Sequence, residues 1–231
     1  MNSETFCRIA SLPKDSSTKV TIRSLQFSDF RELSALLAKN QLERHPFWIN
    51  SEIPEENLRE FFEKMLAVHL SEEKALVAEV CGKIAGYIAS YDLANHAEGQ
   101  LYEELYEKYA KVRENREALP KFSEEFAKMK QKNEVLLVTA LVVSKEFEGK
   151  GIGFLLFDFI NYHPKCMKYA VILSRIASKG SEIISKKLGF STIIKKTWQE
   201  MGKPWENMHE KLKEKGLSLE NDGFSLVILK R

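Results

Sequence analysis

The chain has 231 residues, 44% of them hydrophobic and 29% charged, and its 35 basic and 33 acidic side chains leave a net charge of +2. This length and composition predict a single compact domain. Lysine and glutamate alternate along the expected helices, which is typical of a solvated surface and disfavours a nucleic-acid partner. No apolar run has membrane-spanning length and residues 1–19 lack a signal-peptide pattern, so we expect a cytoplasmic protein without a membrane partner.

The N-terminal segment differs in composition from the rest of the chain. Residues 1–18 are rich in Ser, Lys and Thr and predict a flexible tail, so the ordered domain is expected over 19–231. That domain begins with a short alternating strand at Val20–Arg23. Two amphipathic helices follow, with apolar stripes at Phe30, Leu33, Leu36 and Leu37 and at Leu58, Phe61, Phe62, Met65 and Leu66.

A hairpin and a long polar insertion occupy the middle of the chain. Residues 76–88 alternate in the manner of two short strands, with the turn at Cys81–Lys83. The insertion covers about residues 95–132. Helical spacing of Leu101, Leu105, Tyr109 and Val112 predicts one helix there, and a second is expected after Pro120.

The most informative stretch is a buried strand that leads through a glycine-rich turn into a helix. The strand is Leu136–Val143, and the helix contains the apolar run Phe154–Phe157. Glycines allow a tight turn whose amide N–H groups converge on an anion at the positive end of the helix dipole, so a phosphorylated ligand is predicted. The residues assigned to this site are Gly149, Lys150, Gly151, Ile152, Gly153 and Phe154.

The spacing of the turn separates three classes of phosphate-binding loop. A P-loop is excluded because Lys150 is followed by Gly151 and not by Ser or Thr. A dinucleotide-binding turn fits poorly, since Phe154 stands where its third glycine belongs. A plain strand-to-helix connection remains an alternative. The three cysteines contain no C-x-x-C pair, and no metal site is expected.

A strand-helix-strand unit follows the turn. Tyr169–Leu173 reads as a buried strand, Ser181–Leu188 as a helix that ends at Gly189, and Phe190–Ile194 as a returning strand.

Together, the hairpin, the turn and the Lys-Leu-Gly-Phe ending of residues 187–190 resemble the GCN5-related N-acetyltransferase (GNAT) superfamily, whose motif is [RQ]-x-x-G-x-[GA]. The chain resembles invertebrate arylalkylamine N-acetyltransferases most. The resemblance implies an α/β (α+β) fold with a central mixed, mostly antiparallel sheet of about seven strands flanked by helices. It also implies acetyl-CoA as co-substrate and acetyl transfer to a small primary amine by direct attack. Glu148 replaces the Arg or Gln of the motif, which lowers the expected affinity for CoA.

The resemblance assigns further residues to coenzyme A binding. Pantetheine is expected along an opening between the Leu136–Val143 strand and the next one, bound by main-chain groups of Leu141, Val142 and Val143. Ser178 stands where many relatives have an Asn that contacts CoA. The insertion is expected to wall the acceptor pocket, as in the invertebrate enzymes, or to form a surface helical pair.

The proton donor to the departing sulfur is a tyrosine in many relatives, and this sequence has Ser185 there. Ser181 lies one helical turn earlier on the same face and is the better candidate. It matches one of two serines of the insect dopamine N-acetyltransferases, whose other serine falls at Ala177 here. Helix capping is an equally good reading of Ser178 and Ser181.

For the base, the insect enzymes use a glutamate before a proline after the first helix. Here His45 precedes Pro46, and Glu43 lies two residues earlier. His45 is the first choice because imidazole titrates near neutral pH, and its alternative is a surface loop histidine.

Other acceptors and another class of protein stay open. The acceptor is alternatively a polyamine, an amino acid or a protein amine. Glu148, Ser185 and Ala177 also fit a catalytically weak acyl-CoA-binding protein. The oligomeric state is not predicted.

Overall fold

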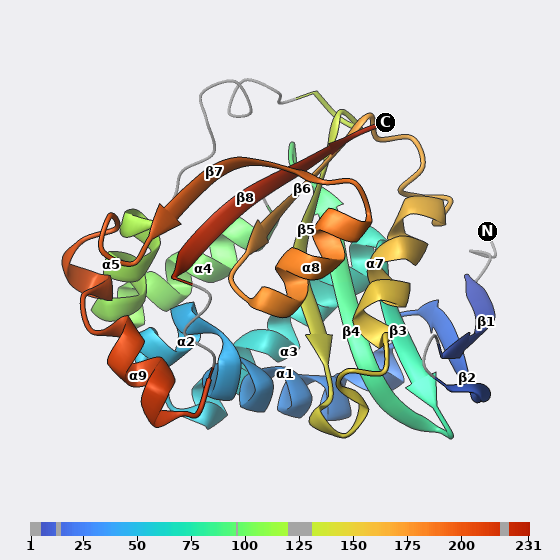
Figure 1. Cartoon of the computed structure of the whole chain (residues 1–231), viewed down its shortest axis with the longest axis horizontal. Helices are drawn as coiled ribbons and strands as arrows, with labels where there is room; N and C mark the ends of the chain where they lie inside the picture. Colours follow the sequence, from blue (N-terminus) through green and yellow to red (C-terminus); the bar gives the residue numbers. More distant parts are fainter. Residues whose placement is uncertain (1–5, 13–14, 96, 120–130, 218–221) are drawn as a thin grey trace.

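The computed structural model describes residues 6–12, 15–95, 97–119, 131–217 and 222–231, which form a sheet with helices on both faces (Figure 1). The strands are β1 (Cys7–Leu12), β2 (Asp15–Ser24), β3 (Ala75–Val80), β4 (Lys83–Asp92), β5 (Val135–Val143), β6 (Val171–Ile176), β7 (Ser191–Thr197) and β8 (Gly223–Lys230). The α-helices are α1 (Phe30–Arg44), α2 (Pro46–Ser51), α3 (Glu55–Glu72), α4 (Ala97–Lys108), α5 (Ala110–Ala118), α7 (Ile152–Tyr162), α8 (Lys179–Lys187) and α9 (Met208–Glu214), and short 3-10 helices are η1 (Phe27–Asp29), η2 (Lys145–Phe147) and η3 (Lys203–Trp205).

The described strands form one eight-stranded sheet in the order β1-β2-β3-β4-β5-β6-β8-β7. Neighbouring strands are antiparallel except for β5 and β6, which are parallel. The predicted mixed, mostly antiparallel sheet is therefore confirmed, with one strand more than the seven or so expected.

The additional strand corrects the prediction of a flexible tail over residues 1–18. Within the described part of that segment, β1 pairs with β2 in an antiparallel hairpin, with Cys7 opposite Arg23. Leu12, Val20 and Ile22 point into the core and are at most 2% exposed. The outward positions carry the Ser, Thr and Lys residues that suggested a tail, because an edge strand has one solvated face.

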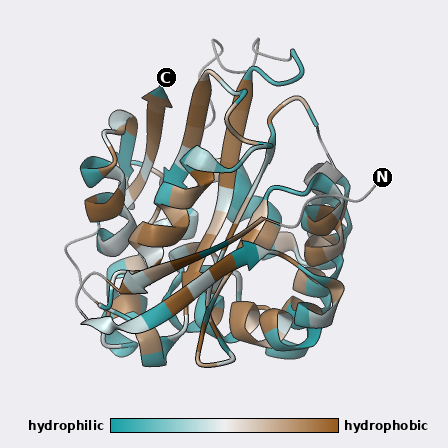
Figure 2. Ribbon diagram, turned by 90° about the vertical axis from the view of Figure 1, so that its right-hand side faces the viewer, coloured by the Kyte–Doolittle hydropathy of each residue, from teal (hydrophilic) through white to brown (hydrophobic). Residues whose placement is uncertain are grey.

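The helices lie in two layers with separate cores. Helices α1, α2, α3, α5 and α9 bury their apolar stripes against one face of the sheet, and α7 packs on the other face with part of α8. Figure 2 shows the hydrophobic strands between these layers. The predicted stripes of α1 and α3 are core positions: Leu33, Leu58 and Leu66 are fully buried.

The middle of the chain largely follows its predicted pattern. The β3–β4 hairpin turns at Cys81 and Gly82, which both have positive φ angles, 50° and 76°. The insertion begins with two helices and not one, since Tyr109 between α4 and α5 has an extended backbone with φ −132°. The helix predicted after Pro120 lies outside the described residues.

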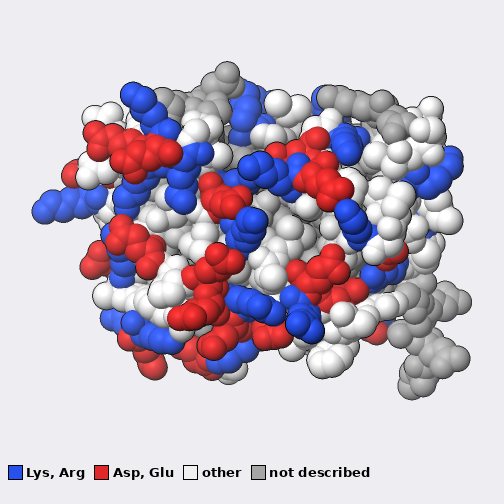
Figure 3. Space-filling model, turned by 90° about the horizontal axis from the view of Figure 1, so that it is seen from below, with Lys and Arg blue, Asp and Glu red and all other residues white. Residues whose placement is uncertain are grey.

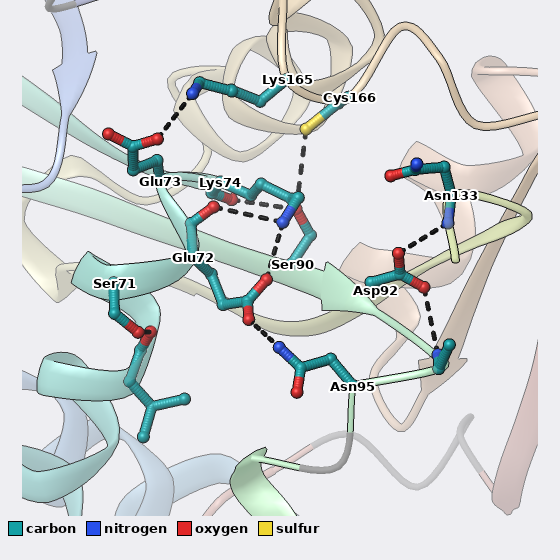
Figure 4. Close-up of polar contacts among 12 residues, drawn as sticks. Ser71, Glu72, Glu73, Lys74, Ser90, Asp92, Asn95, Asn133, Lys165 and Cys166 are labelled. Carbon is teal, nitrogen blue, oxygen red and sulfur yellow. Dashed lines mark hydrogen bonds and ion pairs between the residues drawn. The ribbon is translucent and has the colours of Figure 1, made fainter. Parts of the chain in front are cut away.

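A buried polar network joins the ends of α3 and β4 to β5 (Figure 4). Lys74 is only 8% exposed and its Nζ lies 2.6 Å from Glu72 Oε2. Ser90 donates to the Lys74 carbonyl, and Asp92 accepts from the Asn133 amide at 2.7 Å. These bonds fix one end of β4 and β5, the end remote from the turn before α7.

On the face drawn in Figure 3, acidic and basic side chains are interspersed around uncharged ones. This face therefore carries no large area of one charge sign. In the described part of the chain, none of the helices combines the length and apolarity needed to cross a bilayer. The same residues contain no group of three or more His, Cys, Asp or Glu side chains placed to hold a metal ion.

Candidate functional site

Strands β5 and β6 separate halfway along their length. They pair from Val135 with Val171 to Val138 with Ser174. Beyond this point β6 remains paired with β8 through Arg175 and Ile176, while β5 remains paired with β4 as far as Val143. Residues 140–143 of β5 therefore pair with β4 but not with β6, and their free edge faces a gap at the place where pantetheine is expected.

The register of β4 and β5 decides which main-chain groups face that gap. Ser144 N donates to Ala85 O at 2.9 Å, so in the antiparallel alternation the N–H and C=O groups of Leu141 and Val143 point away from β4. A β-bulge at Thr139 sets this alternation. The Val143 carbonyl accepts one bond, from Asn40 Nδ2 at 3.1 Å, and retains a second lone pair.

The glycine-rich turn presents an open helix N-terminus beside this edge. Gly149 and Gly151 have positive φ angles of 70° and 95°, a conformation that favours glycine. Gly151 caps α7 without any side-chain hydrogen bond. The first N–H groups of a helix have no partner within it, so the amides of Ile152, Gly153 and Phe154 are available to an anion.

Close packing holds the turn against α8. A Cβ atom added to Gly153 would lie 3.2 Å from Ile184 Cδ1 and 3.4 Å from Val143 Cγ2. Only a small residue therefore fits between β5, α7 and α8. The glycine predicted from the motif thus has a packing role in addition to its backbone role.

The gap and the turn belong to one cavity of about 770 Å³. Most of the predicted site residues line it, and they come from segments far apart in the sequence. Those residues are His45, Leu141, Val142, Val143, Gly149, Gly151, Ile152, Gly153, Phe154, Ser178 and Ser181.

Three predicted residues, Ser185, Lys150 and Glu43, do not line this cavity. Ser185 is 1% exposed and its hydroxyl donates to the Glu182 carbonyl at 2.9 Å, because its face of α8 packs on the core. The Lys150 ammonium lies over the Phe147 ring, 5.1 Å from its centre. Glu43 lies within α1, which runs to Arg44, and falls outside the face that reaches the cavity.

Ser178 and Ser181 form a directed pair at the start of α8. The Ser181 amide donates to Ser178 Oγ at 3.2 Å, so Ser178 is a helix cap. The Ser178 hydroxyl in turn donates to Ser181 Oγ at 3.0 Å. A hydroxyl has one proton to donate, and the proton of Ser181 is left for another acceptor in the cavity.

His45 stands where α1 meets α2, in a conformation set by the following proline. A residue before proline favours extended backbone, and His45 has φ −96° and ψ 115°. Its ring lies 6.0 Å from the Phe224 ring, and its Nδ1 is buried without a hydrogen-bond partner in the described structure. Burial lowers the pKa of His45 to about 4, so the imidazole is neutral at pH 7.

Arg44 compensates the negative charge of Glu148, the residue that replaces the Arg or Gln of the GNAT motif. The Arg44 guanidinium forms an ion pair with the Glu148 carboxylate, and both side chains line the cavity. The acid in the motif is thus neutralised by a cation from the last turn of α1. Sequence reasoning missed this pair because the partners lie about a hundred residues apart and only the fold brings them together.

The other side of the cavity contains charged and polar side chains that sequence reasoning did not single out. Arg116 of α5 and Arg175 of β6 line it, together with Thr139 at the bulge. Aromatic side chains complete this wall: Phe47, Trp48, Phe62, Tyr102 and Phe224. The sequence signal for Arg175 is a charge inside a largely apolar strand.

Comparisons with known proteins give matches in structure only. No family model and no curated protein matches the chain by sequence. An agmatine N-acetyltransferase mutant in its apo form superposes with a TM-score of 0.66 at 15% identity, over 92% of this chain and 99% of that one. A protein of the mosquito Aedes aegypti, assigned as arylalkylamine N-acetyltransferase 7, gives 0.65 at 12% identity, over 99% and 98%. The yncA protein of Salmonella typhimurium, assigned as an acetyltransferase and solved with acetyl-CoA, gives 0.54 at 14% identity, over 91% and 93%.

At these identities the likeness establishes the fold. The chain has the GNAT fold, and the fold prediction made from the hairpin, the turn and the Lys-Leu-Gly-Phe ending is confirmed.

Proposed function

We propose that the chain is an acetyl-CoA-dependent N-acetyltransferase that acts on a small primary amine. The observation that carries this proposal is the unpaired edge of β5 beside the uncapped N-terminus of α7, both on one cavity. A ligand with an extended chain that ends in a diphosphate matches this pair of features, since its chain can lie along the strand edge and its diphosphate at the helix N-terminus. The GNAT fold of the neighbours supports the same class of reaction.

Both the diphosphate and the pantetheine of coenzyme A would fit the described residues. The diphosphate would be held by the amides of Ile152, Gly153 and Phe154, where the helix dipole favours negative charge. Pantetheine would hydrogen-bond with the outward main-chain groups of Leu141 and Val143 in the manner of an added strand. Acetyl-CoA supplies the activated acetyl group when it is bound.

The proposed reaction needs no covalent enzyme intermediate. The neutral amine nitrogen attacks the thioester carbonyl carbon, a C–N bond forms and the C–S bond breaks. The nitrogen gives up a proton, and the departing thiolate gains one. A main-chain N–H of the unpaired β5 edge would stabilise the negative oxygen between these steps.

The cavity contains a candidate donor for the proton that the departing sulfur gains and a candidate acceptor for the proton that the amine loses. The Ser181 hydroxyl, whose oxygen already accepts from Ser178, would donate to the sulfur. His45 is neutral at pH 7 and can accept a proton from the amine through water. Its pKa of about 4 makes it a weak base, so we assign it to relaying the proton to solvent and not to storing it.

The acceptor wall favours an amine with an aromatic or apolar body. Phe47, Trp48 and Phe62 contribute large apolar surfaces there, as an arylalkylamine pocket requires.

One observation favours a second candidate, an acyl-CoA-binding protein with little turnover. The serine that stands in the place of the family's tyrosine, Ser185, is buried outside the cavity. If Ser181 does not act as donor, the thiolate must leave without a protein acid.

The two candidates separate in one assay. The protein is incubated with acetyl-CoA and a panel of tyramine, dopamine, tryptamine, spermidine and lysine peptides, and the free thiol of CoA is followed, with CoA affinity measured in parallel by calorimetry. Turnover of at least one amine is expected. CoA binding without turnover would favour the binding protein, and absence of CoA binding would contradict both.

A further inference from the structure

Helix α8 lies beside α7 and presents one face to the cavity (Figure 1). The residues of this face recur every three or four positions, as one side of an α-helix requires. They are Gly180, Ser181, Ile183, Ile184 and Lys187. The proposed function uses Ser181 at the start of this face and leaves its second half without a role.

The second half of this face lies next to the turn that is proposed to hold the diphosphate. A Cβ atom added to Gly153 would lie 3.2 Å from Ile184 Cδ1, so α8 and the start of α7 approach closely at this point. Lys187 follows Ile184 by about one helical turn. A side chain on an α-helix covers the turn that precedes it, so the Lys187 side chain covers the surface beside Ile184.

Lys187 differs from the other lysines of α8 in its surroundings. Glu182, the acidic residue of α8, lies 2.6 Å from Lys186 Nζ and 3.7 Å from Lys179 Nζ. Lys187 forms no ion pair within the described part of the chain, and its side chain is exposed where it lines the cavity. A lysine in the last turn also stabilises the helix dipole, but Lys186 does the same without lining the cavity.

Ile183 adds apolar surface to the same face. Its side chain is 45% exposed, although it is large and hydrophobic, and it lines the cavity. Lys187 follows it at the i+4 position, so the two side chains are neighbours on the helix surface. An apolar side chain beside an ammonium suits a ligand in which a flat base lies close to an anionic group, because the base removes the apolar surface from water.

From this arrangement we infer that Lys187 binds the 3′-phosphate on the adenosine of the coenzyme, and that Ile183 packs on its adenine. The order along the face agrees with the order of groups in coenzyme A: Ser181 is the proposed donor to the sulfur, Ile184 touches the diphosphate turn, and Lys187 lies beyond it. The 3′-phosphate and the 5′-diphosphate share one ribose, so the two phosphate sites must be neighbours. This inference rests on the proposed function and adds a residue that selects the coenzyme.

The test compares CoA with 3′-dephospho-CoA, which lacks only that phosphate, and measures the affinity of each by calorimetry. We expect wild-type protein to bind CoA about fivefold or more tightly, because an ammonium and a phosphate dianion form a charge-assisted hydrogen bond at a partly screened site. Lys187→Met should bind CoA only as tightly as wild type binds 3′-dephospho-CoA, with the affinity for 3′-dephospho-CoA unchanged. Lys187→Arg should keep the preference. Ile183→Ser should weaken both ligands equally, since both carry adenine.

Lys186→Met is the matched control, because Lys186 is the neighbouring lysine in the last turn of α8 and does not line the cavity. It should keep the preference for CoA. The inference is overturned if wild-type protein binds both ligands equally, if Lys187→Met weakens both to the same extent, or if Lys186→Met loses the preference as well. Each of these results keeps the proposed function, whereas absence of binding of either ligand would overturn both. Unchanged affinities in Ile183→Ser would overturn the role of that side chain.

Discussion

The two sides of the cavity are built from different parts of the polypeptide. On the α7 side, the groups proposed to bind the pantetheine and diphosphate of CoA are main-chain groups of Leu141, Val143 and residues 152–154. On the α4–α5 side, the surface is formed by side chains such as Arg116, Arg175 and Trp48. We infer that a cofactor common to many proteins is bound mainly by backbone, which any sequence can supply, while the acceptor is selected by side chains particular to this chain.

The first prediction concerns the main-chain groups on the α7 side of the cavity and has the largest expected effect on CoA affinity. Gly151→Val places a β-branched residue at φ 95°, which costs about 1–3 kcal/mol of backbone strain, and its side chain obstructs the amides at the start of α7. We expect CoA affinity to fall about a hundredfold or more, measured by calorimetry.

Gly202→Val is the control for the first prediction. Gly202 has φ 78° and no atom lies within 4 Å of an added Cβ, so it shares the strain but not the site. It should lose stability and keep its CoA affinity. Equal CoA affinity in wild type and Gly151→Val would place the cofactor elsewhere.

The second prediction concerns two buried histidines, one on each side of the sheet. Burial lowers the pKa of both His45 and His163 to about 4 from 6.5. Between pH 6.5 and 4 the unfolded chain binds protons that the folded chain does not, so the free energy of unfolding falls as the pH falls. Because the two shifts are equal, each histidine contributes at most on the order of 3 kcal/mol across this range.

Urea titrations at pH 7 and pH 4.5 measure this loss. His163→Gln should show a shallower decline than wild type, since glutamine does not titrate. His45→Gln should also be shallower, and in addition should change the pH dependence of acetyl transfer below about pH 5, where wild-type His45 begins to be protonated. An identical pH–rate profile in that variant would remove His45 from the proton path.

The third prediction has the smallest expected effect and concerns the ion pair at the turn. Glu148→Gln removes a negative charge beside the diphosphate site and releases Arg44, so CoA should bind a few-fold more tightly, on the order of 1 kcal/mol for this partly exposed pair. Arg44→Gln should weaken binding, because it leaves Glu148 without its cation.

Glu146→Gln controls for a general change in charge, since Glu146 pairs with Lys83 and does not line the cavity. Both effects should shrink in 1 M salt, where charges are screened within about 3 Å. Tighter binding by Arg44→Gln than by wild type would contradict the assigned role of the pair.

The contrast between the two sides also explains what could be predicted from sequence. The β5–turn–α7 unit was predictable because glycine and a buried apolar run determine local backbone geometry, and Gly151 and Gly153 lie where the motif expects them. Strand β1 was missed because half of its residues face solvent at the sheet edge. The Arg44–Glu148 pair and the placement of Arg116 and Arg175 on one cavity depend on the tertiary fold, which no local pattern encodes.

Ser185 shows the same limit at the scale of one helix. Its spacing from Ser181 suggested a shared face, yet Ser181 lies at the cavity and Ser185 is in the core. Ser181 lies in the first turn of α8, whose start lines the cavity, while Ser185 lies one turn later, where the helix packs on the core. The sequence position of a residue therefore predicted its helix but not its environment.

A crystal structure with bound CoA tests the central claim most directly. The account predicts diphosphate oxygens within hydrogen-bond distance of the amides of residues 152–154, and pantetheine along the outward edge of Leu141 and Val143. A coenzyme bound elsewhere, or a crystal grown in excess CoA with these amides unliganded, would contradict it.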